Sequence, residues 1–143
     1  MLAVDGTGIP LTLLTEAANI SEFKLALQTI DSISVSSRPL HPKIRPDKLV
    51  ADKGYDAKWL RTEIRTRGIK PYIPKRRKQG EQDEPQYNET LKEMYKTRWI
   101  VERTNAWLQN YRRITVRWDR FADSYEAFID LACILICLRR VLK

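Results

Sequence analysis

The sequence predicts an α/β fold in which helices flank one mixed sheet, with the elements in the order ββαβαβαα. Three observations support this prediction. Residues typical of a hairpin turn separate two apolar-rich runs near the N-terminus, two later apolar runs are short and edged by Gly or Pro, and the segments between them carry apolar residues at helical spacing. The 143 residues, 43% of them hydrophobic and 31% charged, are enough for one globular domain with a sizeable core.

The N-terminal part begins with the predicted hairpin. "LAVDGTGIPLTLLTEA", residues 2–17, is typical of two antiparallel strands joined by a turn at residues 5–8. A helix should follow, because Ser21 can cap it and residues 23–30 supply apolar surface. Residues 32–47, with several Ser and Pro, are expected to form a loop.

The middle of the chain predicts a strand, a helix and a second strand. "KLVADKGYD" gives a short apolar strand that ends at Asp52, with Gly54 just beyond it where the chain must turn. Residues 57–67 are predicted to be helical and to end at the glycine that follows them. "IKPYIP" is a strand edged by prolines, which favours a sheet margin. Residues 75–90 change from basic to acidic and contain Pro and Gly, so we expect a mobile loop there.

The C-terminal part predicts two helices. A long helix should run from about Asn88 to Asn110, and a final helix from about Asp123 to Val141 is apolar enough to be largely buried. Cys133 and Cys137 lie in the final helix and are interpreted as buried free thiols. Three tryptophans are interpreted as residues that pack on the core: Trp59, Trp99 and Trp107.

The charge of the chain favours a polyanionic partner. The net charge is +8, and all of the excess lies in residues 51–143, which carry twenty-one Lys and Arg against thirteen Asp and Glu. Such a distribution favours nucleic acid over a membrane surface. The single histidine, His41, argues against a zinc site or a histidine-based catalytic triad. The apolar run 131–138 is far too short to span a membrane, so a cytoplasmic protein is expected.

One polar stripe interrupts the apolar surface of the long predicted helix. In "YKTRWIVERTNAWLQNYRRI", residues 95–114, a regular helix places Tyr95, Arg98, Glu102 and Gln109 within an arc of about 60°. The simplest interpretation is a surface Arg-Glu pair one turn apart. A second interpretation of the stripe includes Asp52, because functional groups often lie where strands end. The carboxylates of Asp52 and Glu102, in basic surroundings, would suit Mg²⁺ or Mn²⁺ and phosphodiester chemistry.

These two motifs, "VADKGYD" and "YKTRWIVERTNAWLQNYRRI", resemble the second half of the catalytic domain of DDE transposases from bacterial insertion sequences. The resemblance extends over nearly the whole chain, residues 1–143, from the hairpin to "AFIDLACILICLRR". It implies a ribonuclease H-like fold in which Asp, Asp and Glu hold two divalent metal ions and DNA strands are cut and joined. Tyr95, Arg98 and Glu102 match the family signature of Tyr, two residues, Arg, three residues and Glu.

The resemblance assigns roles to individual residues. It implies that Asp52 and Glu102 are the second and third catalytic carboxylates and ligands of Mg²⁺ or Mn²⁺, and that Tyr95 and Arg98 touch DNA or orient Glu102. Asp56 is the rival of Asp52 as a ligand, but its place before a helix favours a role as N-cap.

Two departures from the family pattern affect the expected activity. Gln109 occupies the position of the signature's lysine, which removes one charged phosphate contact. The family's first Asp lies on a strand before the hairpin, and neither Asp5, in the hairpin turn, nor Asp31, near a helix end, replaces it. We therefore expect an N-terminally truncated domain that does not transpose DNA alone, either the downstream frame of an element expressed by frameshifting or a decayed fragment.

Two groups of basic residues are candidates for DNA contact. The first is a run in the 75–90 loop, and the second interleaves with Tyr111 and Trp118, a mixture suited to backbone contacts and stacking. A solvated loop is an equally simple explanation of the first group. The candidates are Lys75, Arg76, Arg77 and Lys78 in the loop, and Arg112, Arg113, Arg117 and Arg120.

Three functions compete for this sequence. The first is a transposase catalytic-domain fragment that acts on insertion-sequence ends and target DNA, is associated with the nucleoid, and forms homo-oligomers. The second is a non-catalytic fragment that binds DNA or full-length transposase and modulates transposition. The third is another ribonuclease H-like nuclease, such as a resolvase, against which the Tyr-Arg-Glu spacing argues.

Overall fold

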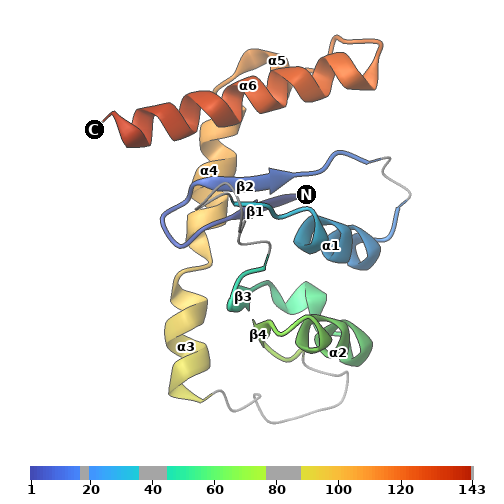
Figure 1. Ribbon diagram of the computed structural model, residues 1–143, viewed down its shortest axis with the longest axis vertical. Coiled ribbons are helices and arrows are strands. Elements are labelled where there is room, and N and C mark those ends of the chain that lie inside the picture. Colours follow the sequence, from blue (N-terminus) through green and yellow to red (C-terminus); the bar gives the residue numbers. More distant parts are fainter. Residues whose placement is uncertain (17–19, 36–44, 77–87, 143) are drawn as a thin grey trace. The chain divides into compact units, whose positions relative to one another are not determined.

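A computed structural model describes residues 1–16, 20–35, 45–76 and 88–142. The chain divides into two compact units (Figure 1). Unit 1 comprises Met1–Ile20 and Trp99–Lys143, and unit 2 comprises Ser21–Arg98. The unit boundary thus falls inside the motif that contains Tyr95, Arg98 and Glu102.

Unit 1 is built on the predicted hairpin. Strands β1 (Leu2–Val4) and β2 (Pro10–Leu13) pair antiparallel, with Leu2 opposite Leu13. Three helices follow: α4 (Trp99–Gln109), α5 (Arg112–Thr115) and α6 (Ala122–Val141). Helix α4 contacts β1 and helix α6 contacts β2 (Figure 1), so the hairpin holds both helices around one core. That core consists of Leu108, Ala132 and Ile136.

The turn of this hairpin fits closely against α4. Gly8 has a φ of +91°, and a Cβ placed on it would lie 2.7 Å from Nη2 of Arg103 and 3.0 Å from Oγ1 of Thr104. A glycine is therefore required here both for the backbone conformation and for the close approach. The Thr104 hydroxyl, fully buried, donates a 2.8 Å hydrogen bond to the Gly8 carbonyl.

Unit 2 contains a parallel strand pair with a helix between the strands. Its elements are α1 (Glu22–Asp31), β3 (Lys48–Val50), the short 3-10 helix η1 (Lys53–Tyr55), α2 (Lys58–Thr66), β4 (Lys70–Tyr72) and α3 (Glu89–Lys96). Strand β3 pairs with β4, Leu49 opposite Pro71. Gly68, at a φ of +77°, follows the last residues of α2, as the sequence predicts. The core is Ile30, Leu60, Ile64, Ile69 and Ile73.

The α/β class and the element order as far as β4 are confirmed, but the described residues contain no single mixed sheet. They form two separate two-stranded sheets, one antiparallel and one parallel. Strand pairing depends on contacts between distant segments, which alternation of apolar residues does not specify. Most of the 75–90 loop, with Arg77 and Lys78, lies outside the described residues, as does His41.

The prediction of one continuous helix from Asn88 to Asn110 is wrong. Helix α3 ends at Lys96 and α4 begins at Trp99. At the break, the Thr97 and Arg98 amides donate to the carbonyls three residues earlier, and the Thr97 hydroxyl also donates to the Met94 carbonyl at 2.7 Å. These bonds tighten the last turn of α3 and end it.

The predicted burial of the final helix is also wrong in part. In α6 only Ile129, Ala132 and Ile136 are buried, because one face alone meets the core, while five large apolar side chains are at least about one-third exposed. Cys133 and Cys137 are free but only partly buried, and burial raises the pKa of the Cys133 thiol to about 11. The exposed side chains are Leu131, Ile134, Leu135, Leu138 and Val141.

Thr104→Val should destabilise the protein by about 1 to 3 kcal/mol, because the buried Gly8 carbonyl loses its donor. Thr62→Val is the matched control, since Thr62 donates to the carbonyl four residues earlier from an exposed position. It should change the free energy of unfolding by less than about 0.5 kcal/mol. Urea unfolding followed by circular dichroism measures both variants, and equal effects would contradict the importance of the hairpin contact.

Candidate metal and DNA-binding residues

Asp52 lies directly after β3, at the carboxyl end of the strand. The Ala51 amide donates to the Tyr72 carbonyl at 3.3 Å and so extends the pairing to the residue before it. Asp52 is the N-cap of η1, where its Oδ1 accepts a 3.4 Å bond from the Gly54 amide. Its side chain remains 48% exposed. The local chain thus holds the carboxylate at the strand end and leaves much of it open to solvent.

Two further residues of the sequence motif lie beside Asp52 in unit 2. Nη1 of Arg98 is 3.9 Å from Oδ2 of Asp52, and the Arg98 guanidinium lies 5.6 Å from the centre of the Tyr95 ring. An ion pair this long and partly exposed contributes little to stability. Arg98 is nevertheless a cationic neighbour of Asp52, whereas the sequence analysis had paired Arg98 with Glu102. Glu102 belongs to unit 1.

Asp56, the rival of Asp52, has a structural role. Arg61 donates two bonds to its Oδ1, at 2.8 and 2.6 Å, and the Arg76 amide donates to Oδ2 at 2.6 Å. The N-cap of α2 is Ala57 and not Asp56, so the predicted capping role is wrong. Partial burial alone would raise the pKa of Asp56, but the bonds from Arg76 and Arg61 hold it below the ordinary 3.8.

The other two acidic candidates are held in a similar way. Oδ1 of Asp5 accepts 2.8 Å bonds from the amide and hydroxyl of Thr7 and a 2.9 Å bond from the Ile9 amide, which closes the hairpin turn. Asp31, the last residue of α1, accepts two bonds from Arg67 at 2.8 and 3.0 Å. Both carboxylates are committed to local structure.

Glu102 projects into solvent from the first turn of α4. Its neighbours Arg103 and Thr104 both bind the hairpin turn: Arg103 donates to the Thr7 carbonyl at 2.7 Å, and Thr104 donates to the Gly8 carbonyl. Since successive residues of a helix point in different directions, these two contacts fix the helix and leave the Glu102 side chain outward.

An alternating stack of arginines and tryptophans lies along α4, and sequence reasoning missed it. The Arg103 guanidinium lies 4.7 Å from the Trp99 ring and 4.8 Å from the Trp107 ring, and Arg140 of α6 lies 5.5 Å from Trp107. Arg140 also donates to the Thr7 carbonyl at 2.6 Å. The spacing of Trp, Arg and Trp at every fourth residue in "WIVERTNAW" is the signal that could have revealed the α4 part of the stack.

The tryptophan predictions hold only for Trp107, which packs against the core of unit 1. Trp99 is 52% exposed, because it covers Arg103 and not the core. Trp59 is 48% exposed and contacts the edge of the unit 2 core through Phe23, whose ring lies 5.8 Å away.

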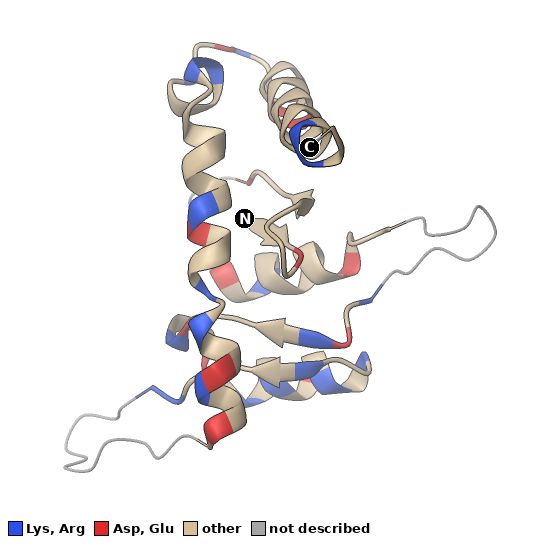
Figure 2. Cartoon of the chain, turned by 90° about the vertical axis from the view of Figure 1, so that its left-hand side faces the viewer, with Lys and Arg blue, Asp and Glu red and all other residues tan. Residues whose placement is uncertain are grey.

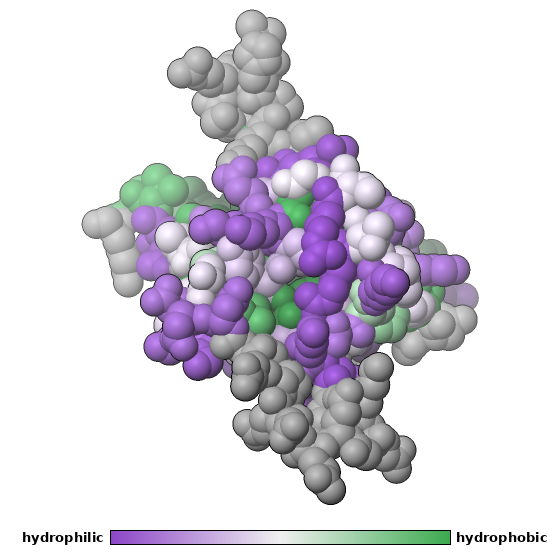
Figure 3. Space-filling view, turned by 90° about the horizontal axis from the view of Figure 1, so that it is seen from below, coloured by the Kyte–Doolittle hydropathy of each residue, from purple (hydrophilic) through white to green (hydrophobic). Residues whose placement is uncertain are grey.

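The remaining DNA candidates lie on exposed elements. Arg112 and Arg113 belong to α5, Arg117 follows it, and Gln109 is the last residue of α4; all four are exposed. Lys75 and Arg76 follow β4 and are also exposed. Basic residues occur on α2, α4 and α5 (Figure 2), and hydrophilic residues cover most of the described face seen in Figure 3.

The described residues lack two features, a cluster of metal-ligating side chains and a membrane-spanning helix. No group of three or more His, Cys, Asp and Glu side chains there is arranged to hold a metal ion. None of the helices in that part of the chain is long and apolar enough to cross a membrane.

These features define a basic α/β protein with a carboxylate at a strand end. A family profile described as "Transposase DDE domain" matches residues 1–137. The chain is 39% identical over 137 residues to a "Putative transposase for insertion sequence element IS402" from Burkholderia cepacia, an alignment that covers 95% of this chain and 60% of that relative. No solved structure matches the chain significantly. The chain belongs to the DDE transposase family of insertion sequences.

Asp56→Asn should destabilise the protein at pH 7 by about 1 to 3 kcal/mol, because Arg61 loses its ionised partner. The lowered pKa of Asp56 means that its stabilisation is fully present above the unfolded-state pKa and is lost as the pH falls through the folded-state pKa. The difference between wild type and variant should therefore shrink as the pH falls below about 4. Urea unfolding at pH 7 and pH 3 measures it, and a constant difference would contradict the ionic role.

Proposed function

We propose that this chain is a catalytic-domain fragment of an insertion-sequence transposase, in which Asp52 and Glu102 are the catalytic carboxylates that hold Mg²⁺ or Mn²⁺ for DNA strand cleavage and strand transfer. The single observation that carries the proposal is the family match over residues 1–137. The grouping of Asp52, Arg98 and Tyr95 in unit 2 supports it, because all three stand at positions of the family motifs.

A ribonuclease H-like strand order is part of this proposal. The parallel pair β3–β4 with α2 between its strands is the kind of unit from which such sheets are built. In this arrangement a residue after β3 lies at the carboxyl edge of the sheet, where α/β proteins place functional groups.

The chemistry of the two carboxylates fits a hard divalent cation, which prefers oxygen ligands. Asp52 is exposed and only weakly held by Arg98, whereas Asp5, Asp31 and Asp56 are occupied by strong hydrogen bonds. When bound, a metal pair stabilises the attacking and the leaving oxygen of the phosphodiester. Because the family's site uses three carboxylates and only Asp52 and Glu102 match its motifs here, we expect this chain alone not to cut DNA.

The exposed basic residues would bind DNA phosphates. Arg98 would balance the charge of Asp52, 3.9 Å away, and offer its guanidinium to a phosphate oxygen, and the Tyr95 ring beside it would help to orient it. Gln109 would add a neutral hydrogen bond. The other proposed contacts are Arg112, Arg113, Arg117, Lys75 and Arg76, with Arg77 and Lys78 outside the described residues.

A second candidate is a non-catalytic fragment that binds DNA or full-length transposase and modulates transposition. The exposed apolar side chains of α6 favour it, since a row such as Leu131, Ile134 and Leu138 can pack against a second copy or a longer relative. Either function would be exerted in the cytoplasm at the nucleoid, where the DNA is.

Mn²⁺ binding tests the assignment of Asp52 independently of activity. Asp52→Asn should weaken Mn²⁺ binding at least about tenfold, because a carboxylate ligand is lost. Asp47→Asn is the matched control, since Asp47 is an exposed carboxylate just before the same strand β3, and it should bind Mn²⁺ like wild type. Titration monitored by electron paramagnetic resonance measures both, and equal loss in the two variants would contradict the assignment.

Cleavage of a labelled element-end duplex tests whether this chain is inactive by itself, as we expect. With Mn²⁺ present, the wild-type chain should bind the duplex but leave it intact, because two carboxylates do not complete the metal site. Glu102→Gln should leave binding within about twofold, because an exposed carboxylate adds little to affinity at the phosphates. Metal-dependent cleavage that disappears in Glu102→Gln would overturn the expected inactivity and establish this chain as the enzyme.

A further inference from the structure

We infer that the loop Val116–Phe121 is an aromatic platform on which unpaired DNA bases stack. Trp118 is 74% exposed and Phe121 is 69% exposed, so both rings offer most of their surface to solvent. Base stacking on such rings tolerates any sequence, because every base has a π face. This inference rests on the proposed function of the chain in DNA cleavage and joining. It names a further ligand for the chain, an unpaired nucleobase.

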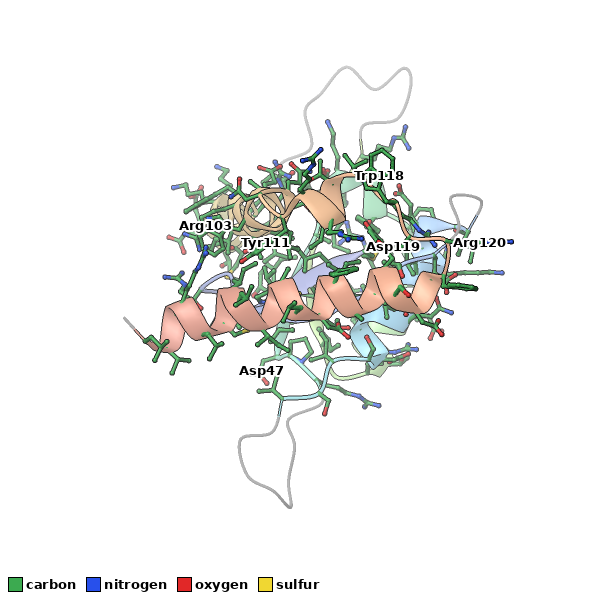
Figure 4. The ribbon with its side chains drawn as sticks, turned by 90° about the horizontal axis from the view of Figure 1, so that it is seen from above. Asp47, Arg103, Tyr111, Trp118, Asp119 and Arg120 are labelled. Atoms are coloured by element: carbon green, nitrogen blue, oxygen red, sulfur yellow. The ribbon has the colours of Figure 1, made fainter. Side chains whose placement is uncertain are left out.

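The loop is held in place from its inner side. Oδ1 of Asp119 is 3.3 Å from Nη1 of Arg113, Arg117 Nε donates to the Asp119 carbonyl at 3.3 Å, and the Asp119 side chain is only 15% exposed. In Figure 4, Asp119 is directed towards α6, whereas Trp118 and Arg120 are directed away from it. The exposed indole therefore results from a fixed backbone, which reduces the entropy cost of binding a base.

Contacts with the start of α6 add to this support. The Tyr125 hydroxyl donates to the Ile114 carbonyl at 3.0 Å, and the Arg117 guanidinium lies 5.1 Å from the Tyr125 ring. Arg113 lies 4.8 Å from the Phe128 ring. Arg113, before the loop, and Arg117, within it, thus each lie beside an aromatic ring of α6, and both side chains are exposed.

The charge around the rings favours nucleic acid over protein as the occupant. Residues 112–121 carry four arginines and one aspartate, and that aspartate is paired with Arg113. The guanidiniums of this segment can bind the phosphates of a single strand, and its two exposed rings can stack on the faces of the bases. Bases inside a duplex have their faces covered by their neighbours, so only unpaired bases can use this platform. Strand cleavage and joining create such bases at DNA ends.

The test compares two labelled DNA probes by fluorescence anisotropy: a blunt 20-base-pair duplex and the same duplex with a six-nucleotide thymidine tail. Wild type should bind the tailed probe about tenfold more tightly than the blunt one. Trp118→Ala should remove this preference and leave binding to the blunt duplex within about twofold. Trp118→Phe, which keeps a ring, should retain most of it. Because Trp118 is so exposed, neither variant should unfold the protein, which circular dichroism checks.

Arg112→Ala is the control for phosphate contact, since Arg112 is exposed on α5 and carries charge without a ring. It should weaken both probes equally and keep the preference for the tail. If Trp118→Ala binds the tailed probe as wild type does, the platform is disproved while the proposed function stands. If wild type binds neither probe, DNA binding by this chain and the platform both fail. A change of mass in sedimentation on Trp118→Ala, with the tail preference intact, would make the loop a protein interface and overturn the inference.

Discussion

The contact between Gly8 and Thr104 is the constraint on which unit 1 depends. Because a side chain at Gly8 would collide with Arg103 and Thr104, the hairpin turn can approach α4 this closely only with glycine. The approach lets the buried Thr104 hydroxyl satisfy the Gly8 carbonyl. Glu102 precedes Thr104 by two residues, a rotation of about 200° on a helix. The contact that buries Thr104 therefore also turns Glu102 outward, where a carboxylate can serve chemistry.

The break between α3 and α4 has a consequence for the motif as a whole. On a continuous helix, Tyr95, Arg98 and Glu102 would form one rigid stripe, as the sequence predicts. With Thr97 and Arg98 in a turn, Tyr95 and Arg98 belong to unit 2 and Glu102 belongs to unit 1. Within unit 2, Arg98 lies beside Asp52 and the Tyr95 ring. The spacing of the motif thus joins two structural units and does not describe one helix face.

Features encoded by local signals could be predicted from the sequence, and features that depend on distant contacts could not. The hairpin turn, the short strand β3 just before Asp52 and the glycine that ends α2 each follow from a few adjacent residues. The contact of Arg98 with Asp52 joins residues far apart in the chain, and no periodicity encodes it. The exposed face of α6 was missed for a related reason, since an apolar sequence shows which residues could be buried but not how many partners a helix has.

Four aspartates considered for the candidate site differ in the groups that already bind them, and this difference supports the proposed choice of Asp52. Asp5 closes a turn, Asp31 binds Arg67 and Asp56 binds Arg61, so each is held by groups that a metal ion would have to displace. Displacement would leave a partly buried guanidinium or amide without its acceptor, at a cost of about 1 to 3 kcal/mol. Among the residues that the structure describes, Asp52 has the long Arg98 contact and one amide bond, so a cation can reach it at lower cost. The hydrogen bonds and ion pairs that already occupy Asp5, Asp31 and Asp56 are thus the physical reason for preferring Asp52 to these three residues.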